Sequence, residues 1–402
     1  MKVLVADKFE DVGVGELEAH GFDVDLRPGL AGDALVAALS SSDPDVLVVR
    51  GTQVPSAALT AGARLKLVVR AGAGYDTIDV ATASAEGIYV ANCPGKNAIA
   101  VAELAWGLIL SCDRRIPDQT ADLRVARWNK KDYGVARGLF GRTLGVIGLG
   151  PIGLAVIERA HAFGMPVIAW SRSLTPERAR EIGVDCAETL LDLASRADIV
   201  SLHVPGGAGT RKLVDREFVA AMKPGAYLIN TSRGSVVDEE ALQWGIAERK
   251  LRAGLDVFDG EPKAATAEFD CAVARSPGVY GTHHVGASTD QAQTAIALEA
   301  VRIIRHFRAT GAVLHCVNRA VKSPATCLLT VRHRNRPGVL AQVFQVLSEA
   351  RINVEEMENV IYEGALAASA RIQLDTSPSE TDLDRIRRSC EEILSVDLTS
   401  IG

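Results

Sequence analysis

Three glycines near the middle of the chain have the spacing that a phosphate cradle requires. The run VIGLGPIG places Gly148, Gly150 and Gly153 in GxGxxG order, between a predicted strand and the predicted helix LAVIERAHAF. The first glycine permits a tight turn, the second lets the backbone approach a pyrophosphate, and the third allows close packing of helix on strand. The helix N-terminus adds a dipole that favours negative charge. We interpret the run as a dinucleotide-binding turn; an ordinary glycine-rich turn is the alternative.

The end of the next predicted strand, PVIAWSRS, bears on which dinucleotide fits. A site for NAD usually has Asp or Glu there, bonded to the ribose 2′-hydroxyl. Ser171 and Arg172 stand in that place. Without a carboxylate a 2′-phosphate is not repelled, and an arginine can pair with it. We therefore expect NAD or NADP as cofactor, with a lean toward NADP or dual use; the alternative is a solvent-exposed Arg172 and NAD held by other contacts.

Two series of alternating strands and helices must position these residues. Short apolar runs such as KVLVAD, VLVVRG and IYVANC alternate with helical stretches in the first series, and a second series opens at TLGVIGLG. This alternation predicts two parallel α/β sheets. We expect long helices at about 98–112 and at about 291–308. Lys322, Ser323 and Pro324 read as a linker.

Beyond the linker the order changes to strand, helix, strand, strand, helix, strand, which predicts a ferredoxin-like domain. Pro337 suits the first turn of its first helix, and Asn335 could cap that turn. The predicted fold class is therefore α/β, with two doubly wound parallel-sheet domains and a small C-terminal domain.

The composition excludes several classes of function. A formal net charge of −6, with basic residues spread along the chain, gives no footprint for nucleic acid. Charged residues begin within the first dozen positions, and no apolar run approaches the roughly 20 residues that span a bilayer, so we expect no signal peptide and no membrane segment. The seven cysteines lie far apart without a CxxC pair. They predict reduced thiols in a cytoplasmic protein, without a metal site.

Six runs, in order, resemble the D-isomer-specific 2-hydroxyacid dehydrogenases. They are RAGAGYDTID (70–79), NCPGKNAIAVAE (92–103), VIGLGPIG, NTSRGSVVDEEAL (230–242), GLDVFDGEP (254–262) and THHVGAST (282–289). The resemblance covers roughly the first 320 residues. It implies a flavodoxin-like substrate domain at 1–96 with 290–322, a Rossmann cofactor domain at 97–289, and a regulatory domain at 323–402.

The same resemblance implies an active site of an arginine, a glutamate and a histidine, which map to Arg233, Glu261 and His284. A histidine can take the hydroxyl proton while hydride leaves the neighbouring carbon. A carboxylate fixes its tautomer, and a guanidinium grips the substrate carboxylate. Each residue alone could be structural. One departure is His283, where the family usually has proline, so His283 could perturb the loop or compete as base.

Further site residues follow from the resemblance. The cofactor would contact Gly148, Gly150, Pro151, Ile152, Gly153, Ser171, Arg172, Thr231 and Asp256, and the substrate would contact Arg50, Arg70, Ala73, Gly74 and Asn97. Arg50 and Arg70 match positions that grip a 3-phosphate in phosphoglycerate-specific members; surface arginines at strand ends are the alternative. Lys130 is a further candidate, which would reach the site from a partner subunit.

The segment from about 326 to 402 resembles the ACT domain, which implies L-serine bound between paired subunits at His333, Asn335 and Asn353. The alternative is an ACT domain used only for assembly. Together the resemblances imply oxidation of 3-phosphoglycerate to 3-phosphohydroxypyruvate, the first step of L-serine biosynthesis, by a homodimer or homotetramer. An NADPH-dependent glyoxylate/hydroxypyruvate reductase is the nearer alternative, and a dinucleotide-sensing binding protein like the C-terminal-binding co-repressors is the remote one.

Overall fold

The computed structural model of the chain describes residues 1–262, 266–320 and 323–401. The chain divides into two compact units, Met1–Asn318 and Arg319–Gly402, each considered by itself. Ser323 and Pro324 of the predicted linker have no regular structure, and Lys322 lies outside the described residues. The finer domain bounds predicted within the first unit stay a proposal.

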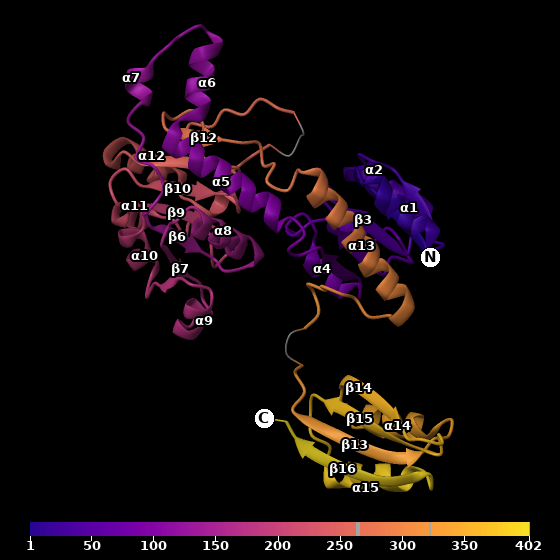
Figure 1. The fold of residues 1–402 in the computed structure, drawn as a ribbon. Coiled ribbons are helices and arrows are strands. Elements are labelled where there is room, and N and C mark those ends of the chain that lie inside the picture. The colour runs from indigo at the N-terminus through magenta and orange to yellow at the C-terminus, as the bar shows by residue number, and fades with distance from the viewer. Residues whose placement is uncertain (263–265, 321–322, 402) are drawn as a thin grey trace. The chain divides into compact units, whose positions relative to one another are not determined.

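The first unit contains a five-stranded sheet with the order β2-β1-β3-β4-β5, in which every neighbouring pair is parallel (Figure 1). This is the flavodoxin-like order. Apolar residues are buried on both faces, as expected for a sheet between two helical layers. The strands are β1 (Lys2–Val5), β2 (Asp23–Leu26), β3 (Val46–Val49), β4 (Leu67–Arg70) and β5 (Tyr89–Asn92), and the helices are α1 (Asp11–Ala19), α2 (Gly32–Ser42), α3 (Ser56–Leu59), α4 (Val80–Ala85) and α13 (Asp290–Thr310).

A second, seven-stranded sheet follows, with the order β12-β11-β10-β9-β6-β7-β8 and only parallel pairs. The inner strand β6 begins the series, and later strands add on both sides of it, as in dinucleotide-binding folds. The strands are β6 (Leu144–Ile147), β7 (Val167–Trp170), β8 (Asp185–Cys186), β9 (Ile199–Leu202), β10 (Tyr227–Asn230), β11 (Arg252–Leu255) and β12 (Val279–Gly281). The helices are α5 (Ala98–Arg114), α6 (Ile116–Arg124), α7 (Lys130–Tyr133), α8 (Pro151–Ala162), α9 (Pro176–Glu181), α10 (Leu190–Arg196), α11 (Arg216–Ala221) and α12 (Glu239–Arg249), with a short 3-10 helix at Gly234–Val236.

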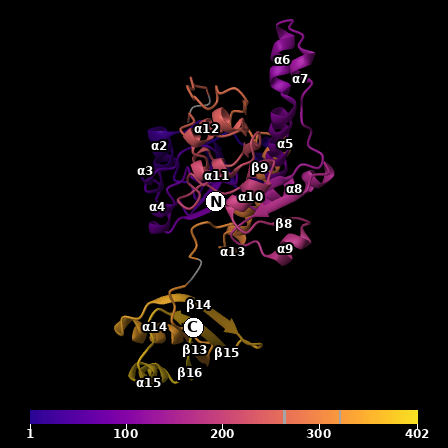
Figure 2. The same ribbon diagram turned by 90° about the vertical axis from the view of Figure 1, so that its left-hand side faces the viewer.

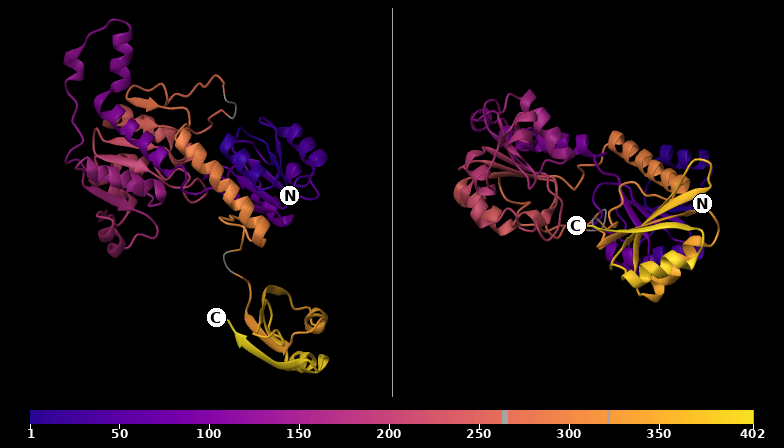
Figure 3. Two further views of the ribbon diagram at one scale, coloured as in Figure 1. Left: turned by 45° about the vertical axis from the view of Figure 1, so that its right-hand side comes forward. Right: turned by 90° about the horizontal axis from the view of Figure 1, so that it is seen from below.

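The second sheet also has a buried apolar core on each face. Helices α6 and α7 form an arm that projects from the body of this unit (Figure 3). In the described residues, no helix has the length and apolarity needed to cross a membrane. The long helices predicted at about 98–112 and 291–308 are confirmed as α5 and α13, each with slightly wider bounds.

The second unit is an antiparallel four-stranded sheet with the order β14-β15-β13-β16, and Figure 2 shows both of its helices on one face. Its elements are β13 (Cys327–Arg334), α14 (Val339–Glu349), β14 (Val354–Ile361), β15 (Ala367–Leu374), α15 (Glu380–Ser389) and β16 (Ile393–Ser400). This is the ferredoxin-like arrangement, so the predicted fold class is confirmed for both sheets of the first unit and for this domain.

The predicted start of helix α14 was wrong. The N-cap is Gly338, whose φ of 88° lies in the left-handed region that favours glycine. Pro337 therefore precedes the helix. Asn335 does not cap it, because its Nδ2 donates instead to the Ala365 carbonyl at 3.1 Å.

Candidate functional site

The glycine turn after β6 has the shape of a phosphate cradle. Gly148 has a φ of 98°, and a Cβ there would lie 2.2 Å from the His203 carbonyl oxygen. A Cβ on Gly153 would lie 2.1 Å from the Gly148 carbonyl oxygen, so only glycine fits at both positions. At Gly150, the N-cap of α8, a Cβ would meet nothing within 4 Å. The backbone at the helix N-terminus is thus open to a pyrophosphate.

Other residues predicted for the cofactor lie at the same edge of the sheet. Pro151 and Ile152 open helix α8. Strand β7 pairs with β6 and ends at Trp170. Ser171 and Arg172 follow it directly, so they lie at the end of the strand next to the one that carries the glycine turn. Arg172 is exposed and forms no ion pair with the described residues. Thr231, directly after β10, is buried, and its hydroxyl has no partner in the part of the chain that the structure describes. An unpaired buried hydroxyl fits a bound polar ligand.

Asp256 has a use that the sequence did not reveal. It follows β11, is almost fully buried, and accepts hydrogen bonds from Thr282 Oγ1 at 2.6 Å and from the Val285 and Gly286 N–H groups at 2.9 Å. Its own carbonyl accepts from the His284 N–H at 2.8 Å. Asp256 therefore fixes the loop that carries His284, and its predicted contact with the cofactor stays a prediction.

His284 and Glu261 meet directly. His284 Nδ1 lies 2.5 Å from Glu261 Oε1, and Glu261 Oε2 accepts from the Phe258 N–H at 3.5 Å. Burial raises the pKa of Glu261, but the hydrogen bond and the charge of His284 outweigh it, so the net pKa lies below its ordinary value. The paired histidine is His284, whereas the exposed His283 makes no hydrogen bond to a described residue. Nε2 of His284 has no hydrogen-bond partner among the described residues.

Arg233 lies next to the loop of Glu261, because a Cβ on its neighbour Gly234 would lie 2.0 Å from the carbonyl carbon of Phe258, and its charge helps to lower the pKa of Glu261. It follows β10 and precedes the 3-10 helix. Its Nε donates to Asp76 Oδ2 at 2.9 Å, Nη2 lies 2.8 Å from that oxygen, and Nη1 donates to the Ser232 carbonyl at 2.8 Å. A Cβ on Gly74 would lie 1.8 Å from Arg233 Nη2. Sequence reasoning missed Asp76, although it stands within the run RAGAGYDTID.

Two more guanidinium groups lie near Arg233. Arg70 is the last residue of β4, and Arg50 follows β3. Burial, together with the charges of Arg233 and Arg50, lowers the pKa of Arg70 to about 10. Arg70 Nε is buried without a partner among the described residues. The loop of Arg50 is held by Asp7, whose Oδ2 accepts from the N–H groups of Arg50, Gly51 and Thr52.

Three further residues predicted for the substrate have polar groups without a hydrogen-bond partner in the described part of the chain, and one of them, Gly74, lies against Arg233. The N–H groups of Ala73 and Gly74 donate to no acceptor within the described residues, whereas the Ala73 carbonyl accepts from Asn92 Nδ2 at 2.6 Å. Asn97 is the N-cap of α5, yet its buried Oδ1 has no partner in the described chain. Unpaired donors beside clustered arginines suit an anionic ligand.

The predicted effector residues are not brought together within one copy of the second unit. His333 is buried near the end of β13, with Nδ1 2.8 Å from the Arg334 carbonyl and Nε2 3.4 Å from Asn359 Oδ1. Asn335 follows β13, whereas Asn353 precedes β14 and donates to Glu355 at 2.7 Å. Residue 354 pairs with Leu374, and His333 pairs with Ala368, so Asn353 lies at the opposite end of the sheet. Asn359 is a contact that the sequence pattern did not indicate.

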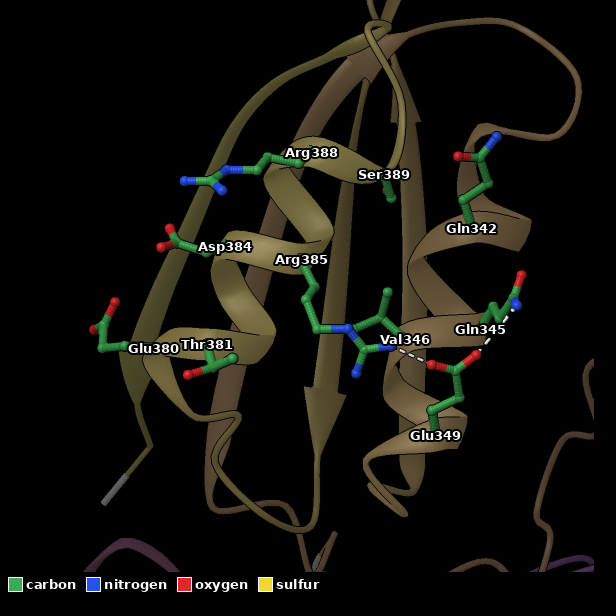
Figure 4. Close-up of a pocket in the computed structure, with 10 residues that line it drawn as sticks. All are labelled: Gln342, Gln345, Val346, Glu349, Glu380, Thr381, Asp384, Arg385, Arg388 and Ser389. Atoms are coloured by element: carbon green, nitrogen blue, oxygen red, sulfur yellow. Dashed lines mark hydrogen bonds and ion pairs between the residues drawn. The ribbon is translucent and has the colours of Figure 1, made fainter.

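Two concave surfaces lie apart from the predicted catalytic and effector residues. A groove of about 800 Å³ lies between α14 and α15, and in Figure 4 Arg385 reaches across it to Glu349 while Asp384 and Arg388 point outward. A second hollow, of about 370 Å³, lies in the arm and is lined by Trp128 and Lys130. Trp128 is 80% exposed. Neither surface includes a residue of the His284 site.

Comparisons with known proteins agree with this geometry. Residues 106–286 match the description "D-isomer specific 2-hydroxyacid dehydrogenase, NAD binding domain", and residues 328–358 match the ACT domain. The chain is 41% identical to a D-3-phosphoglycerate dehydrogenase of Methanocaldococcus jannaschii, over 73% of this chain and 55% of that protein. It is 43% identical to a hydroxypyruvate reductase of Thermotoga maritima, over 65% of this chain and 83% of that one.

A solved structure of an NADPH-dependent glyoxylate/hydroxypyruvate reductase from Sinorhizobium meliloti, with NADP and malonate, superposes with a TM-score of 0.68 at 32% identity. The superposition covers 80% of this chain and 99% of that chain. By contrast, the chain spans only a little over half the length of the D-3-phosphoglycerate dehydrogenases it matches.

Proposed function

Because the chain belongs to the family of D-isomer-specific 2-hydroxyacid dehydrogenases, we propose that it oxidises D-3-phosphoglycerate to 3-phosphohydroxypyruvate with NAD or NADP. The family predicted from six motifs is confirmed, and so is the dinucleotide-binding domain. The proposed substrate rests above all on one observation: the charges of Arg50 and Arg233 act on the half-buried Arg70, and among the three guanidinium groups only that of Arg233 forms an ion pair with a described acid, Asp76. Three cations held together against their repulsion suit a substrate with both a carboxylate and a phosphate.

His284 and Glu261 have separate roles in the proposed reaction. His284 Nε2 takes the proton of the 2-hydroxyl group as general base. Glu261 holds Nδ1 and stabilises the imidazolium that forms, since its depressed pKa keeps it ionised at neutral pH. A bound dinucleotide would supply the acceptor for the hydride that leaves carbon 2. In the reverse direction His284 returns its proton to the carbonyl oxygen.

The anionic groups of the substrate are bound by different donors. Arg233 and the N–H groups of Ala73 and Gly74 would hold the carboxylate, and Asn97 would help to shape the site. Arg50 and Arg70 would hold the phosphate, because a guanidinium presents paired N–H donors to phosphate oxygens. The open turn at Gly150, with Pro151, Ile152 and the unpaired Thr231 hydroxyl, would hold the dinucleotide.

The test is a comparison of substrates on the full chain. We expect kcat/KM for D-3-phosphoglycerate to exceed that for D-glycerate by at least 100-fold, with both NAD and NADP assayed, because the phosphate adds charge-assisted hydrogen bonds worth about 1.5–3 kcal/mol each. Equal rates with the two substrates would contradict the phosphorylated substrate, and no oxidation of either would contradict the reaction in this direction.

A second candidate is an NADPH-dependent glyoxylate/hydroxypyruvate reductase. Arg172 favours it, because the position beside the cradle lacks the carboxylate that would repel a 2′-phosphate. The hydroxypyruvate reductase of Thermotoga maritima also matches over most of its length. Rapid reduction of unphosphorylated hydroxypyruvate with NADPH, together with a poor response to 3-phosphohydroxypyruvate, would decide for this candidate.

We further propose that the ACT domain binds L-serine between two copies, in a cytoplasmic homodimer or homotetramer. His333 and Asn335 lie at one end of the sheet and Asn353 at the other, so a shared site needs a second chain. All seven cysteines are unpaired, which suits a reducing compartment. Inhibition by L-serine, measured together with the sedimentation of the full chain, tests this proposal.

A further inference from the structure

We propose that Asp76 is a positioning residue that aims the Arg233 guanidinium at the carboxylate of the substrate. The two residues lie 157 positions apart and come from the loop after β4 and the loop after β10. Their contact therefore joins the carboxyl edge of the five-stranded sheet to that of the seven-stranded sheet. The inference rests on the proposed function, since it concerns how that site binds its substrate.

The hydrogen bonds of Arg233 to described residues use only part of its guanidinium. An arginine has five N–H donors. Nε donates to Asp76 Oδ2 and Nη1 donates to the Ser232 carbonyl, while Nη2 forms an ion-pair contact of 2.8 Å with Asp76 Oδ2. Two donors are therefore used, and the other three, one N–H on Nη1 and both on Nη2, have no hydrogen-bond acceptor among the described residues. The edge formed by Nη1 and Nη2 can hold a carboxylate bidentately.

The Arg233 side chain packs closely against the backbone of two glycines. A Cβ on Gly74 would lie 1.8 Å from Arg233 Nη2, and a Cβ on Gly206 would lie 2.9 Å from Arg233 Cγ. The guanidinium thus passes closely over Gly74, whose N–H is one of the unpaired donors predicted to hold the substrate carboxylate. Asp76 stands two residues further along the same loop. The loop 73–76 therefore supplies both donors and the acceptor that orients the third donor.

Positioning is distinguishable from the two other roles that this aspartate could have. A purely repulsive carboxylate would weaken binding of an anionic substrate, so its removal would lower KM. A residue that only adds stability would leave kinetics unchanged. An aiming residue requires an acceptor oxygen at this place, and its negative charge is secondary. Asparagine keeps an acceptor oxygen, whereas alanine removes it.

The experiment compares Asp76→Asn and Asp76→Ala with the wild-type full chain. Glu86→Gln is the control, an exposed acid at the end of α4 that has no ion pair among the described residues. We expect Asp76→Ala to lower kcat/KM for the hydroxy acid about 10- to 100-fold through both KM and kcat, since a hydrogen bond to a charged group is lost. Asp76→Asn is expected to stay within about threefold, and KM for the dinucleotide to stay unchanged in all variants.

A binding measurement separates this inference from the choice of substrate. Oxalate presents a carboxylate beside a second oxygen-bearing carbon, and its binding to the NAD-saturated protein is measured by calorimetry. We expect about 10-fold weaker binding in Asp76→Ala and little change in Asp76→Asn. Unchanged or tighter oxalate binding in Asp76→Ala, or equal losses in the two variants, would overturn the inference. Absence of 3-phosphoglycerate oxidation by the wild type would instead count against the proposed function alone.

Discussion

At the scale of single residues, the site contains positively charged side chains whose burial lowers the stability of the fold but which can bind anions. Arg70 is the clearest example, because it is largely buried, has an unpaired Nε, and lies near two other arginines. A structural arginine in such a place would need a carboxylate partner. The absence of one among the described residues points to a ligand that supplies the negative charge.

Substituting Arg70 should therefore separate stability from function. We predict that Arg70→Met raises the free energy of unfolding by about 1–2 kcal/mol, since it removes a buried, incompletely paired cation. It should also raise KM for D-3-phosphoglycerate at least 10-fold and leave KM for D-glycerate nearly unchanged. Urea denaturation and steady-state kinetics check both halves. A less stable variant with an unchanged KM for the phosphorylated substrate would contradict this reading.

Arg172 decides the choice of dinucleotide if it pairs with a 2′-phosphate. We predict that Arg172→Asp lowers the ratio of kcat/KM for NADP to kcat/KM for NAD by at least 10-fold, because the new carboxylate repels the phosphate and can bond a ribose hydroxyl. Arg178→Ala is the control, since Arg178 is an exposed arginine on α9 that pairs with Glu181. An unchanged ratio in Arg172→Asp would mean that other contacts set the preference.

At the scale of elements, the sequence indicated the architecture well and the long-range contacts poorly. The strands of both parallel sheets are short buried runs flanked by helices, so their pattern alone was informative. The contacts Arg233–Asp76 and His333–Asn359 were missed, because they join residues of different elements. Asn335 was misjudged as a cap because the backbone turn at Gly338 cannot be read from residue types alone.

Helix α13 contains an ion cluster that was also missed. Glu299 is buried within α13, accepts from Arg302, and lies 3.2 Å from Lys96 Nζ and 3.0 Å from His315 Nε2. The hydrogen bonds from Arg302 are the main cause that lowers the pKa of Glu299 from 4.5 to about 2, against the effect of burial. This carboxylate ties α13 to the segment before α5 and to the segment that follows α13.

The pKa of Glu299 has a consequence for stability. We predict that Glu299→Gln lowers the free energy of unfolding at pH 7 by about 2–3 kcal/mol, because it removes the buried partner of several cations. The effect is smaller than for a fully buried ion pair, since these cations are exposed to solvent. Since the folded-state pKa lies below the unfolded one, the contribution of the carboxylate is complete above about pH 4.5 and is lost as pH falls toward about 2. The difference from wild type should therefore shrink over that range. A constant difference from pH 7 to pH 3, with Glu18→Gln as control, would contradict the assignment.

At the scale of the whole molecule, a two-sheet dehydrogenase unit is joined to a ferredoxin-like domain within one chain. One copy of that domain keeps Asn353 apart from His333 and Asn335. The proposed regulation by L-serine would therefore require two copies of the chain, and the exposed Trp128 on the arm would offer a further surface for their contact.

The response to L-serine tests this organisation. We predict that L-serine inhibits the wild-type chain and that Asn353→Ala raises the concentration for half-inhibition about 10-fold or more, since an amide partner of the amino acid is lost. Gln342→Ala, in the groove between α14 and α15, should leave that concentration unchanged. Inhibition that is equal in all three proteins, or absent from the wild type, would leave the ACT domain with a role in assembly only.

The most direct test of the central claim is a comparison of two adjacent histidines. His284 contacts Glu261, whereas His283 is exposed. With D-3-phosphoglycerate and saturating dinucleotide, kcat should fall about 10²–10⁴-fold in His284→Asn, as expected for loss of a general base, and less than threefold in His283→Asn. Near-normal turnover in His284→Asn, with the large loss in His283→Asn, would contradict the account.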